Sequence, residues 1–275
     1  MIETATDLTK HKVAIIIPFY RDYVSPYEII SLQQCERILH NHEKIIVKPK
    51  GLTLTDRSEL FTCNKVEAFD DGYFKSIAGY NSLMLSAEFY QRFLGYEYIL
   101  IYQMDCFVFR DELQYWCDKD YDYIGAPWIK KTYHKNKVEL WYSNIRKYLK
   151  KRYNNLDQNE PNKYQIDNMV GNGGFSLRRV KKFYDITILM KPKIDYYLSK
   201  KQVEYNEDVF WSLEVNRERK ILNIPPLHTA LAFAFETPPI KNKYLNDQNL
   251  PFGCHDWDLH RLYWAPIFKK IGYEI

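Results

Sequence analysis

Cysteine is scarce in this sequence of 275 residues, and what there is follows no metal or redox spacing. The five cysteines form no Cys-x-x-Cys pair, and their odd number leaves at least one unpaired. This excludes a disulfide framework and a structural zinc site as expectations, and it predicts a reducing compartment. A Gly-x-Ser-x-Gly elbow is also missing, so a serine hydrolase is not expected.

Long apolar runs and a strong excess of one charge are missing too. No run approaches the length of a membrane span, and the start, MIETATDLTKHK, lacks the apolar core of a signal peptide. We therefore expect a cytoplasmic protein. A net charge of +4 is too small to indicate nucleic-acid binding. Because no repeat or linker-like segment interrupts the chain, one domain over residues 1–275 is expected.

Aromatic residues, by contrast, make up 16% of the chain and include 24 tyrosines. Tyrosine-rich surfaces suit stacking on sugars and contacts with other proteins. The codon bias of an AT-rich genome would produce the same composition, so both interpretations stay open.

Apolar strand patterns alternate with helical ones along the first half of the chain. VAIIIPFY (13–20) is a continuous apolar run, typical of a strand buried on both faces, and a helical pattern follows at 26–42. Further strands are predicted at 44–49, 96–103 and 121–127. The alternation predicts an α/β fold with a mixed, mostly parallel central sheet flanked by helices.

Polar residues follow several of these strands, where ligands bind in open α/β sheets. The clearest is Asp105 in YILIYQMDCFVF (98–109). Burying an unpaired carboxylate costs several kcal/mol. Asp105 must therefore have a partner, reach solvent at the strand end or hold a cation; capping a helix is the structural alternative.

Two later motifs carry further candidates. GNGG (171–174) lacks the spacing of a dinucleotide-binding loop, so its glycines suit a close backbone approach or a positive φ. NEDVFW (206–211) looks like a helix start with Asn206 as cap. Its acids, Glu207 and Asp208, could act as a general base or only stabilise the helix dipole.

These motifs resemble those of nucleotide-sugar glycosyltransferases with the GT-A fold, in particular a bacterial family known mainly from sequence. The resemblance rests on VAIIIPFYR, GYNSLMLSAEFYQRF, YILIYQMDCFVF, YDYIGAPW, GNGGFSLR, NEDVFW and LPFGCHDW, and it covers about residues 12–265. In those enzymes an apolar strand runs into Asp-x-Asp, and the second Asp binds a divalent metal. Asp105 matches that second Asp, whereas Gln103 replaces the first.

The resemblance implies a GT-A-like domain with a nucleotide-sugar-binding half (12–128) and an acceptor-binding half (129–265). It implies Asp208, or else Glu207, as the catalytic base. It also implies Mn²⁺ or Mg²⁺ held by Asp105 and His255, although a structurally bonded His255 is the alternative. Donor contacts are expected from Pro18, Tyr20, Arg21, Lys75, Tyr80, Asn81, Gln103 and Asp105, and acceptor or sugar contacts from Trp128, Gly173, Gly174 and Trp211.

The predicted function is a metal-dependent glycosyltransferase of hexosyl or related type, inverting, in bacterial surface polysaccharide synthesis. A UDP-sugar donor and a glycan or lipid-linked glycan acceptor are expected. A catalytically inactive glycan-binding relative is the first alternative, because the first Asp of the triplet is replaced. A nucleotidyltransferase is the second, but it would carry a Gly-rich, cationic loop after the first strand, where this chain has PFYRDYVSP.

The stretch 130–155 is basic, with nine Lys and Arg against one Glu. Trp141, Tyr142 and Tyr148 lie among the lysines of 138–153. This pattern fits peripheral contact with the inner membrane face, and a solvated helix beside the acceptor site fits it equally.

Overall fold

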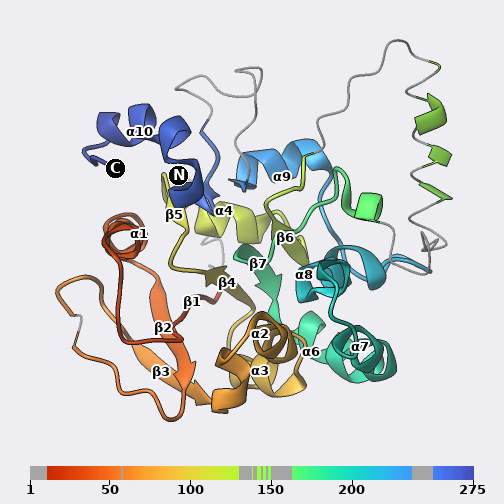
Figure 1. The fold of residues 1–275 in the computed structure, drawn as a ribbon, viewed down its shortest axis with the longest axis horizontal. Helices are drawn as coiled ribbons and strands as arrows, with labels where there is room; N and C mark the ends of the chain where they lie inside the picture. The colour runs from red at the N-terminus through yellow and green to blue at the C-terminus, as the bar shows by residue number, and fades with distance from the viewer. Residues whose placement is uncertain are drawn as a thin grey trace, which may run out of the picture.

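A six-stranded β-sheet forms the centre of the computed structural model (Figure 1). In sheet order its strands are β3 (Lys65–Phe69), β2 (Glu43–Pro49), β1 (Val13–Pro18), β4 (Tyr98–Tyr102), β7 (Phe175–Arg179) and β6 (Tyr123–Gly125). The strands β3, β2, β1 and β4 are parallel, whereas β7 runs antiparallel to both β4 and β6. Because β7 comes from the second half of the chain, both halves contribute to one sheet.

The structure describes residues 11–56, 58–129, 163–236 and 250–275. Between the second and third of these ranges it also describes residues 138, 141–143, 145–146 and 148–149. No helix within these described residues is long and apolar enough to cross a membrane.

The central strands are apolar because both faces of the sheet are covered. In β1, Val13, Ile15 and Ile17 enter one hydrophobic cluster, and Ala14 and Ile16 enter the other. This two-residue alternation is the side-chain period of a strand. A continuous apolar run is therefore required here, as in other parallel sheets buried on both sides.

Helices pack on both faces of the sheet (Figure 1). One face is covered by α1 (Pro26–Leu39), α4 (Leu113–Asp118) and α9 (Leu227–Phe233). The other is covered by α2 (Ile77–Met84), α3 (Ala87–Arg92), α6 (Val180–Leu189), α7 (Lys191–Leu198) and the segment formed by α8 (Glu207–Val209) and the π turn η4 (Phe210–Glu214). The predicted fold class, a mixed and mostly parallel central sheet flanked by helices, is confirmed.

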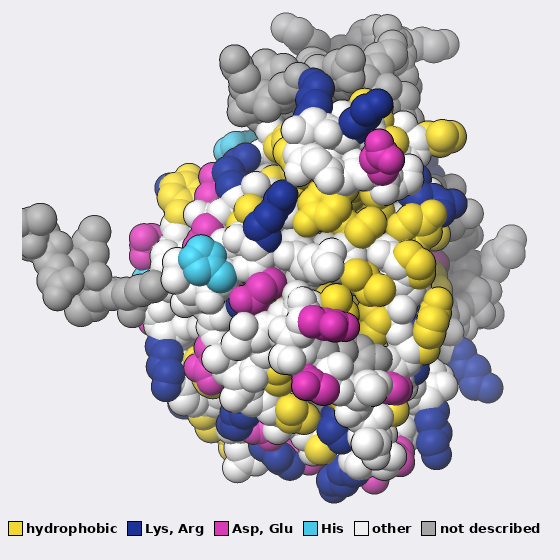
Figure 2. All heavy atoms as spheres, turned by 90° about the vertical axis from the view of Figure 1, so that its left-hand side faces the viewer, with side chains coloured by type: hydrophobic (Ala, Val, Ile, Leu, Met, Phe, Trp, Pro, Cys, Tyr) yellow, Lys and Arg dark blue, Asp and Glu magenta, His cyan; other side chains and the backbone are white. Residues whose placement is uncertain are grey.

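A second, three-stranded sheet lies beside the first. It consists of β5 (Phe107–Val108), β9 (Gly253–Cys254) and β8 (Ala234–Phe235). The helix α10 (Arg261–Lys270) packs near α1 around a third cluster that contains Trp257, Trp264 and Phe268. Figure 2 shows the side of the molecule that carries α1 and α10, where hydrophobic side chains form a band among charged ones. The short β9 strand brings the C-terminal region next to the end of β4.

Short 3₁₀ turns connect several of these elements. They are η1 (Asp71–Phe74), η2 (Lys163–Ile166), η3 (Val203–Tyr205) and η5 (Trp257–His260). The helix α1 begins with a reciprocal cap, in which the Ser25 side chain accepts from the Glu28 backbone and Glu28 accepts from the Ser25 backbone. It ends at Leu39, three residues before the end of the predicted segment.

Candidate functional site

A cavity of about 1130 Å³ opens at the carboxyl ends of β1 and β4. This is the edge of an open α/β sheet at which ligands bind. All predicted site residues except Trp211 line it: Pro18, Tyr20, Arg21, Lys75, Tyr80, Asn81, Gln103, Asp105, Trp128, Gly173, Gly174, Glu207, Asp208 and His255. Segments far apart in sequence therefore converge on one space large enough for a nucleotide sugar.

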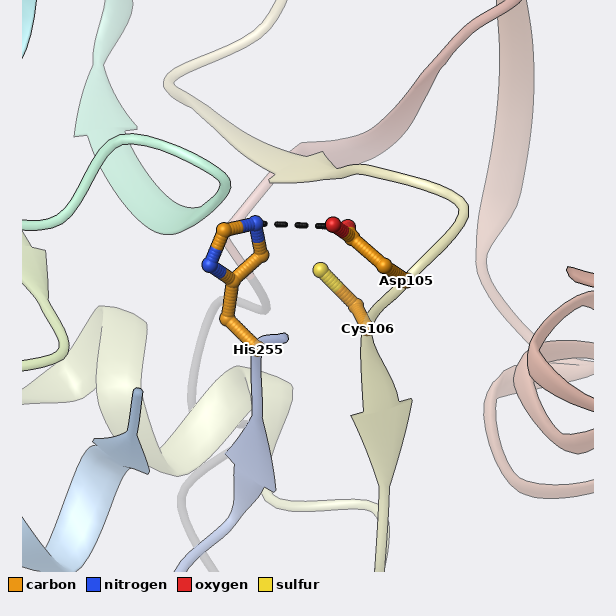
Figure 3. A group of neighbouring side chains, drawn as sticks. All are labelled: Asp105, Cys106 and His255. Atoms are coloured by element: carbon orange, nitrogen blue, oxygen red, sulfur yellow. Dashed lines mark ion pairs between the residues drawn. The ribbon is translucent and has the colours of Figure 1, made fainter. Parts of the chain in front are cut away.

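Asp105 and His255 face each other at one end of this cavity (Figure 3). Asp105 lies in the turn after β4, and His255 follows β9. Nε2 of His255 lies 3.2 Å from Oδ1 of Asp105 and 3.1 Å from Oε1 of Gln103. The carboxylate that the sequence places in an apolar run thus has a partner, and its side chain keeps 34% exposure toward the cavity.

This contact shifts the pKa values of both partners. Burial by itself would raise the pKa of Asp105, but the charge and hydrogen bond of His255 hold it below its usual value. Burial would lower the pKa of His255, yet Asp105, and with it Asp256, raises that pKa to about 9. The imidazolium therefore supplies the positive charge that the surrounding carboxylates require.

Two further carboxylates extend this group. Ligand atoms of Glu236, His255 and Asp256 lie within 4.8 Å of one another, as do those of Asp105, Cys106 and His255. Burial raises the pKa of Glu236, and burial together with Asp105 raises that of Asp256. The result is a group of three carboxylates around one imidazole.

Cys106 differs from the other members of the group. Its thiol is buried and donates a hydrogen bond to the Gly174 carbonyl at 3.2 Å. Burial raises the pKa of this thiol well above its usual value. Oxygen and imidazole atoms are therefore the ligands that this group offers to a hard divalent cation.

Glu207 and Asp208 lie on another wall of the cavity and have different surroundings. Both oxygens of Glu207 accept hydrogen bonds from the guanidinium of buried Arg178, at 3.0 and 3.1 Å. Asp208 instead accepts one hydrogen bond, from the backbone N–H of Val209 at 2.8 Å. Burial, and then the charge of Glu207, raises the pKa of Asp208 to about 8. Of the two predicted bases, only Asp208 has a carboxyl group that is not held in a bidentate ion pair.

The helix start at this wall differs from the prediction in one detail. Asn206 is the residue before α8, as expected, but its side chain makes no capping hydrogen bond. It accepts instead from Nδ2 of Asn81, while Oδ1 of Asn81 accepts from the backbone N–H of Glu207 at 3.2 Å. A residue on α2 therefore holds the start of α8 in place.

The glycine-rich loop lies between the two groups of acids. Gly171 has a φ of 144°, which side chains rarely adopt. A Cβ on Gly173 would lie 2.2 Å from Oε1 of Glu207, and one on Gly174 would lie 2.1 Å from Nε2 of His255. Gly171 therefore has the positive φ expected for this loop, whereas Gly173 and Gly174 approach side chains of the protein, and a close approach to a sugar stays a prediction.

On the side of β1 and α2, the cavity wall carries cations and aromatic groups. Arg21 donates to both carboxylate oxygens of Glu28, at 2.9 and 3.1 Å. The side chain of Lys75 is exposed, and Tyr20 is 53% exposed. The Tyr80 hydroxyl is buried, and burial raises its pKa. These groups are available to a ligand that enters along β1.

Trp211 does not line the cavity, so the prediction that it contacts a sugar acceptor is wrong. The indole is completely buried, with its ring 4.2 Å from that of Phe183 and 5.8 Å from that of Tyr90. It belongs to the core beneath α6. Trp128, the other predicted tryptophan, lies on the cavity wall and is partly exposed.

Only part of the basic segment 138–153 is among the described residues. Its described apolar side chains are all exposed: Val138, Trp141, Tyr142, Ile145, Tyr148 and Leu149. The remaining residues of the predicted membrane contact, including all three of its lysines, lie outside the described part of the chain.

Several cavity residues were missed by sequence reasoning. Asn172 accepts from the Gly174 N–H at 2.8 Å and donates to Glu236 at 2.7 Å, which ties the glycine-rich loop to the acidic group. Asp256 stands beside His255 in the quoted FGCHDW motif, so its proximity was readable from the sequence. Glu236 had no local signal, because its contact with Asn172 forms only when distant segments fold together. Arg178 lies behind the cavity wall and ends the quoted GNGGFSLR motif, but its ion pair with Glu207 joins distant segments and was not predicted.

Fold and site together define an α/β protein with an acidic cavity at the carboxyl edge of its parallel strands. The chain belongs to the DUF5672 family, described as a protein of unknown function, which it matches over residues 64–255. No curated protein matches the sequence.

The chain is also similar to solved structures of two glycosyltransferases. One is core-mannan synthase A (CmsA/Ktr4) from Aspergillus fumigatus in its Mn/GDP form, at 11% identity and a TM-score of 0.46 over 76% of this chain and 72% of that chain. The other is apo mouse xyloside xylosyltransferase 1, at 11% identity and a TM-score of 0.47 over 88% and 96%. Likenesses this distant do not transfer a donor, an acceptor or a metal to this chain.

Proposed function

We propose that this protein is a metal-dependent glycosyltransferase of the GT-A type. It transfers a sugar from a nucleoside-diphosphate donor, with UDP-sugars preferred, to a glycan or lipid-linked glycan acceptor, with inversion. The observation that carries the proposal is the division of one cavity into two acidic groups. The carboxylate–imidazole group suits a divalent cation, and Asp208 suits a proton acceptor.

The first group fits a cation by its donor atoms. Oδ1 of Asp105 is buried and, apart from its ion pair with His255, makes no hydrogen bond within the described residues. Asp105 and His255 would hold the ion once His255 has released its proton, because only neutral imidazole binds a metal; Glu236 and Asp256 are close enough to contribute. Carboxylates and imidazole are ligands of Mn²⁺, and Mg²⁺ sites commonly use one or two carboxylates. A bound ion would neutralise the charge that develops on the departing nucleoside diphosphate.

Asp208 fits the role of general base for the acceptor hydroxyl. A catalytic base works best when its pKa lies near the working pH, and burial raises the pKa of Asp208 to about 8. A single carboxylate on the acceptor side is sufficient for an inverting transfer, in which the acceptor attacks and the proton leaves to the base.

The two halves of the chain contribute different residues to the cavity wall, which supports separate donor and acceptor sides. The half 12–128 contributes Arg21, Lys75 and Tyr20, which suit the diphosphate and the nucleobase of the donor. The half 129–265 contributes Gly173 and Asp208, next to which the acceptor would enter. We assign the enzyme to bacterial surface polysaccharide synthesis in the cytoplasm.

Contact with the inner membrane face is a separate part of the proposal. It is supported by the exposed apolar side chains at 138–149 and by the basic charge of 130–155. Sedimentation with vesicles of anionic lipid, but not with neutral ones, is expected, and it should weaken in high salt. Sedimentation with neither kind of vesicle would leave the solvated-helix interpretation standing, and equal sedimentation with both would contradict the electrostatic part of the proposal.

Thermal unfolding with nucleotides tests the main proposal. UDP, GDP and CDP are each added with and without Mn²⁺, and a nucleotide at 100 times its Kd should stabilise the protein by about 2.7 kcal/mol. We expect one nucleotide, UDP first, to raise the Tm only with Mn²⁺. Asp105→Asn should abolish that increase.

Asp111→Asn is the matched control for this substitution. Asp111 pairs with His42 at 3.0 Å and is 36% exposed, which resembles the pairing and exposure of Asp105, but it lies outside the cavity. The control should keep the nucleotide response. If no nucleotide stabilises the wild type, the transferase proposal is wrong, and binding of glycans without nucleotide would support the inactive relative. Release of pyrophosphate from a nucleoside triphosphate and a sugar phosphate would instead indicate a nucleotidyltransferase.

A further inference from the structure

A buried ion pair joins the glycine-rich loop to the segment that carries Asp208. Arg178 on β7 is completely buried, and both of its terminal nitrogens donate to Glu207. The guanidinium also donates to the Tyr90 hydroxyl at 2.9 Å and to the Gly173 carbonyl at 3.3 Å. We infer that Glu207 and Arg178 are positioning residues, which fix the location and the protonation of the neighbouring Asp208. This inference rests on the proposed role of Asp208 as base.

The geometry leaves the pair little freedom. Gly173 approaches Glu207 so closely that an added Cβ would lie 2.2 Å from Oε1 of that residue and 3.0 Å from a nitrogen of Arg178. The Arg178 Nε also donates to Ser176 at 3.0 Å, and Ser176 donates to the Gly173 carbonyl at 2.8 Å. Loop, strand and helix start are thus connected by charged hydrogen bonds, which hold side chains more firmly than neutral ones.

The fixed bidentate pair also explains why Glu207 is not the proton acceptor. A base must turn its carboxylate toward the acceptor hydroxyl and then carry the proton. Protonation of Glu207 would leave the guanidinium of Arg178 buried without its counter-charge, and an unpaired buried charge is strongly unfavourable. Asp208 is not the counter-charge of a buried cation within the described residues, so its protonation has no such cost.

Groups on several surrounding elements act electrostatically on Asp208. Glu207 on the same segment and Glu236 after β8 disfavour its ionisation, while Arg178 on β7 favours it. Tyr123 on β6 also interacts with it but stays neutral, because burial raises its pKa well above the usual value. The negative charge of Glu207 is the largest of the charge effects on Asp208. Glu207→Gln should therefore make Asp208 a stronger acid.

The test compares Glu207→Gln with Glu214→Gln. Glu214 is also buried and ion-paired, with Arg217 at 2.5 Å and Lys193 at 3.0 Å, but it does not line the cavity. Both variants lose a buried ion pair and should lose stability. The readout is the titration of the Asp208 carboxyl carbon by NMR in protein labelled with ¹³C-aspartate, assigned with Asp208→Asn.

In Glu207→Gln we expect the Asp208 midpoint to fall by about one pH unit or more, the size of effect that a nearby like charge exerts. The acidic limb of the pH profile of kcat/KM should move down by the same amount. Glu214→Gln should shift neither. An unchanged midpoint in Glu207→Gln, or an equal shift in both variants, overturns the inference.

A second variant covers the case in which Glu207→Gln does not fold. Arg178→Met combined with Glu207→Gln removes the whole pair, which proteins tolerate better than loss of one partner. Its Asp208 midpoint should lie below that of the wild type, and a midpoint equal to the wild type overturns the inference. Because the titration needs no substrate, its result stands apart from the nucleotide test: failure of the proposed transferase function would appear in that test, not here.

Discussion

Ionisation of Asp208 should cost the folded protein stability, and Asp208→Asn should remove this cost. Asp208 lines the cavity and is partly buried, and Glu207 lies beside it in sequence. Burial and the charge of Glu207 raise its pKa from 3.8 to about 8. Asparagine has nearly the same shape as the neutral acid and carries no charge at any pH. The substitution therefore isolates the charge.

The sign follows from which state holds the proton. Between about pH 4 and pH 8 the folded protein keeps a proton on Asp208 that the unfolded chain has released, so stability falls as pH rises through this range. At about 1.4 kcal/mol for each tenfold change in acidity, the upper limit of the cost is about 6 kcal/mol. Because the cavity admits water beside Asp208, we expect about 2 kcal/mol. In a chain of this length that corresponds to about 5 °C in Tm.

The assay is thermal unfolding of wild type and Asp208→Asn from pH 4 to pH 9. The two proteins should have similar Tm values near pH 4, and the variant should become more stable as pH rises, with the full difference above pH 8. Asp185→Asn, at an exposed residue paired with Lys181, is the control and should show no such divergence. A constant difference across the range, or a less stable variant at pH 9, would refute the buried-carboxyl reasoning.

Other substitutions have equally specific outcomes. Asp105→Asn should weaken Mn²⁺ binding, measured by the paramagnetic resonance of free Mn²⁺, at least about tenfold. Gly174→Ala should displace His255, since the new Cβ would lie 2.1 Å from its Nε2, and should lose the Mn²⁺-dependent nucleotide response; Gly95→Ala, where a Cβ meets nothing within 4 Å, should keep it. Trp211→Ala should lower the free energy of unfolding in urea by about 3–5 kcal/mol, because the indole fills the core.

The sequence was sufficient for the centre of the fold because its signals are local. The run at Val13–Pro18 had to be buried on both faces, and the crossover through α1 places β2 parallel to β1. The strand β7 was harder to place. It follows a glycine-rich loop and enters the sheet between β4 and β6, antiparallel to both. Nothing within Phe175–Arg179 encodes that insertion, since it depends on which sheet edge is left open by the rest of the chain.

The residues of the candidate site also differ in whether a local sequence signal predicts them. Asp105 was identifiable because a carboxylate directly after a buried strand has few favourable environments, and one of them is the edge of the sheet at which ligands bind. Its neighbours in the acidic group were not identifiable by the same argument. Glu236 reaches the group through a two-residue strand, β8, that pairs with β9. Such a short pairing is set by tertiary contacts, and it leaves no periodic pattern in the sequence.

The different surroundings of Glu207 and Asp208 depend on the buried core beside them, which includes Trp211. Glu207 begins α8, and Trp211, four residues later, lies in the π turn that follows α8. Glu207 and Trp211 are both buried. Arg178 links Glu207 to the Tyr90 hydroxyl, and the ring of Trp211 contacts the ring of Tyr90. The guanidinium of Arg178 supplies the counter-charge that buried Glu207 requires. Asp208, the next residue, also lines the cavity but is less buried than Glu207, and its carboxyl group is not held by the Arg178 guanidinium.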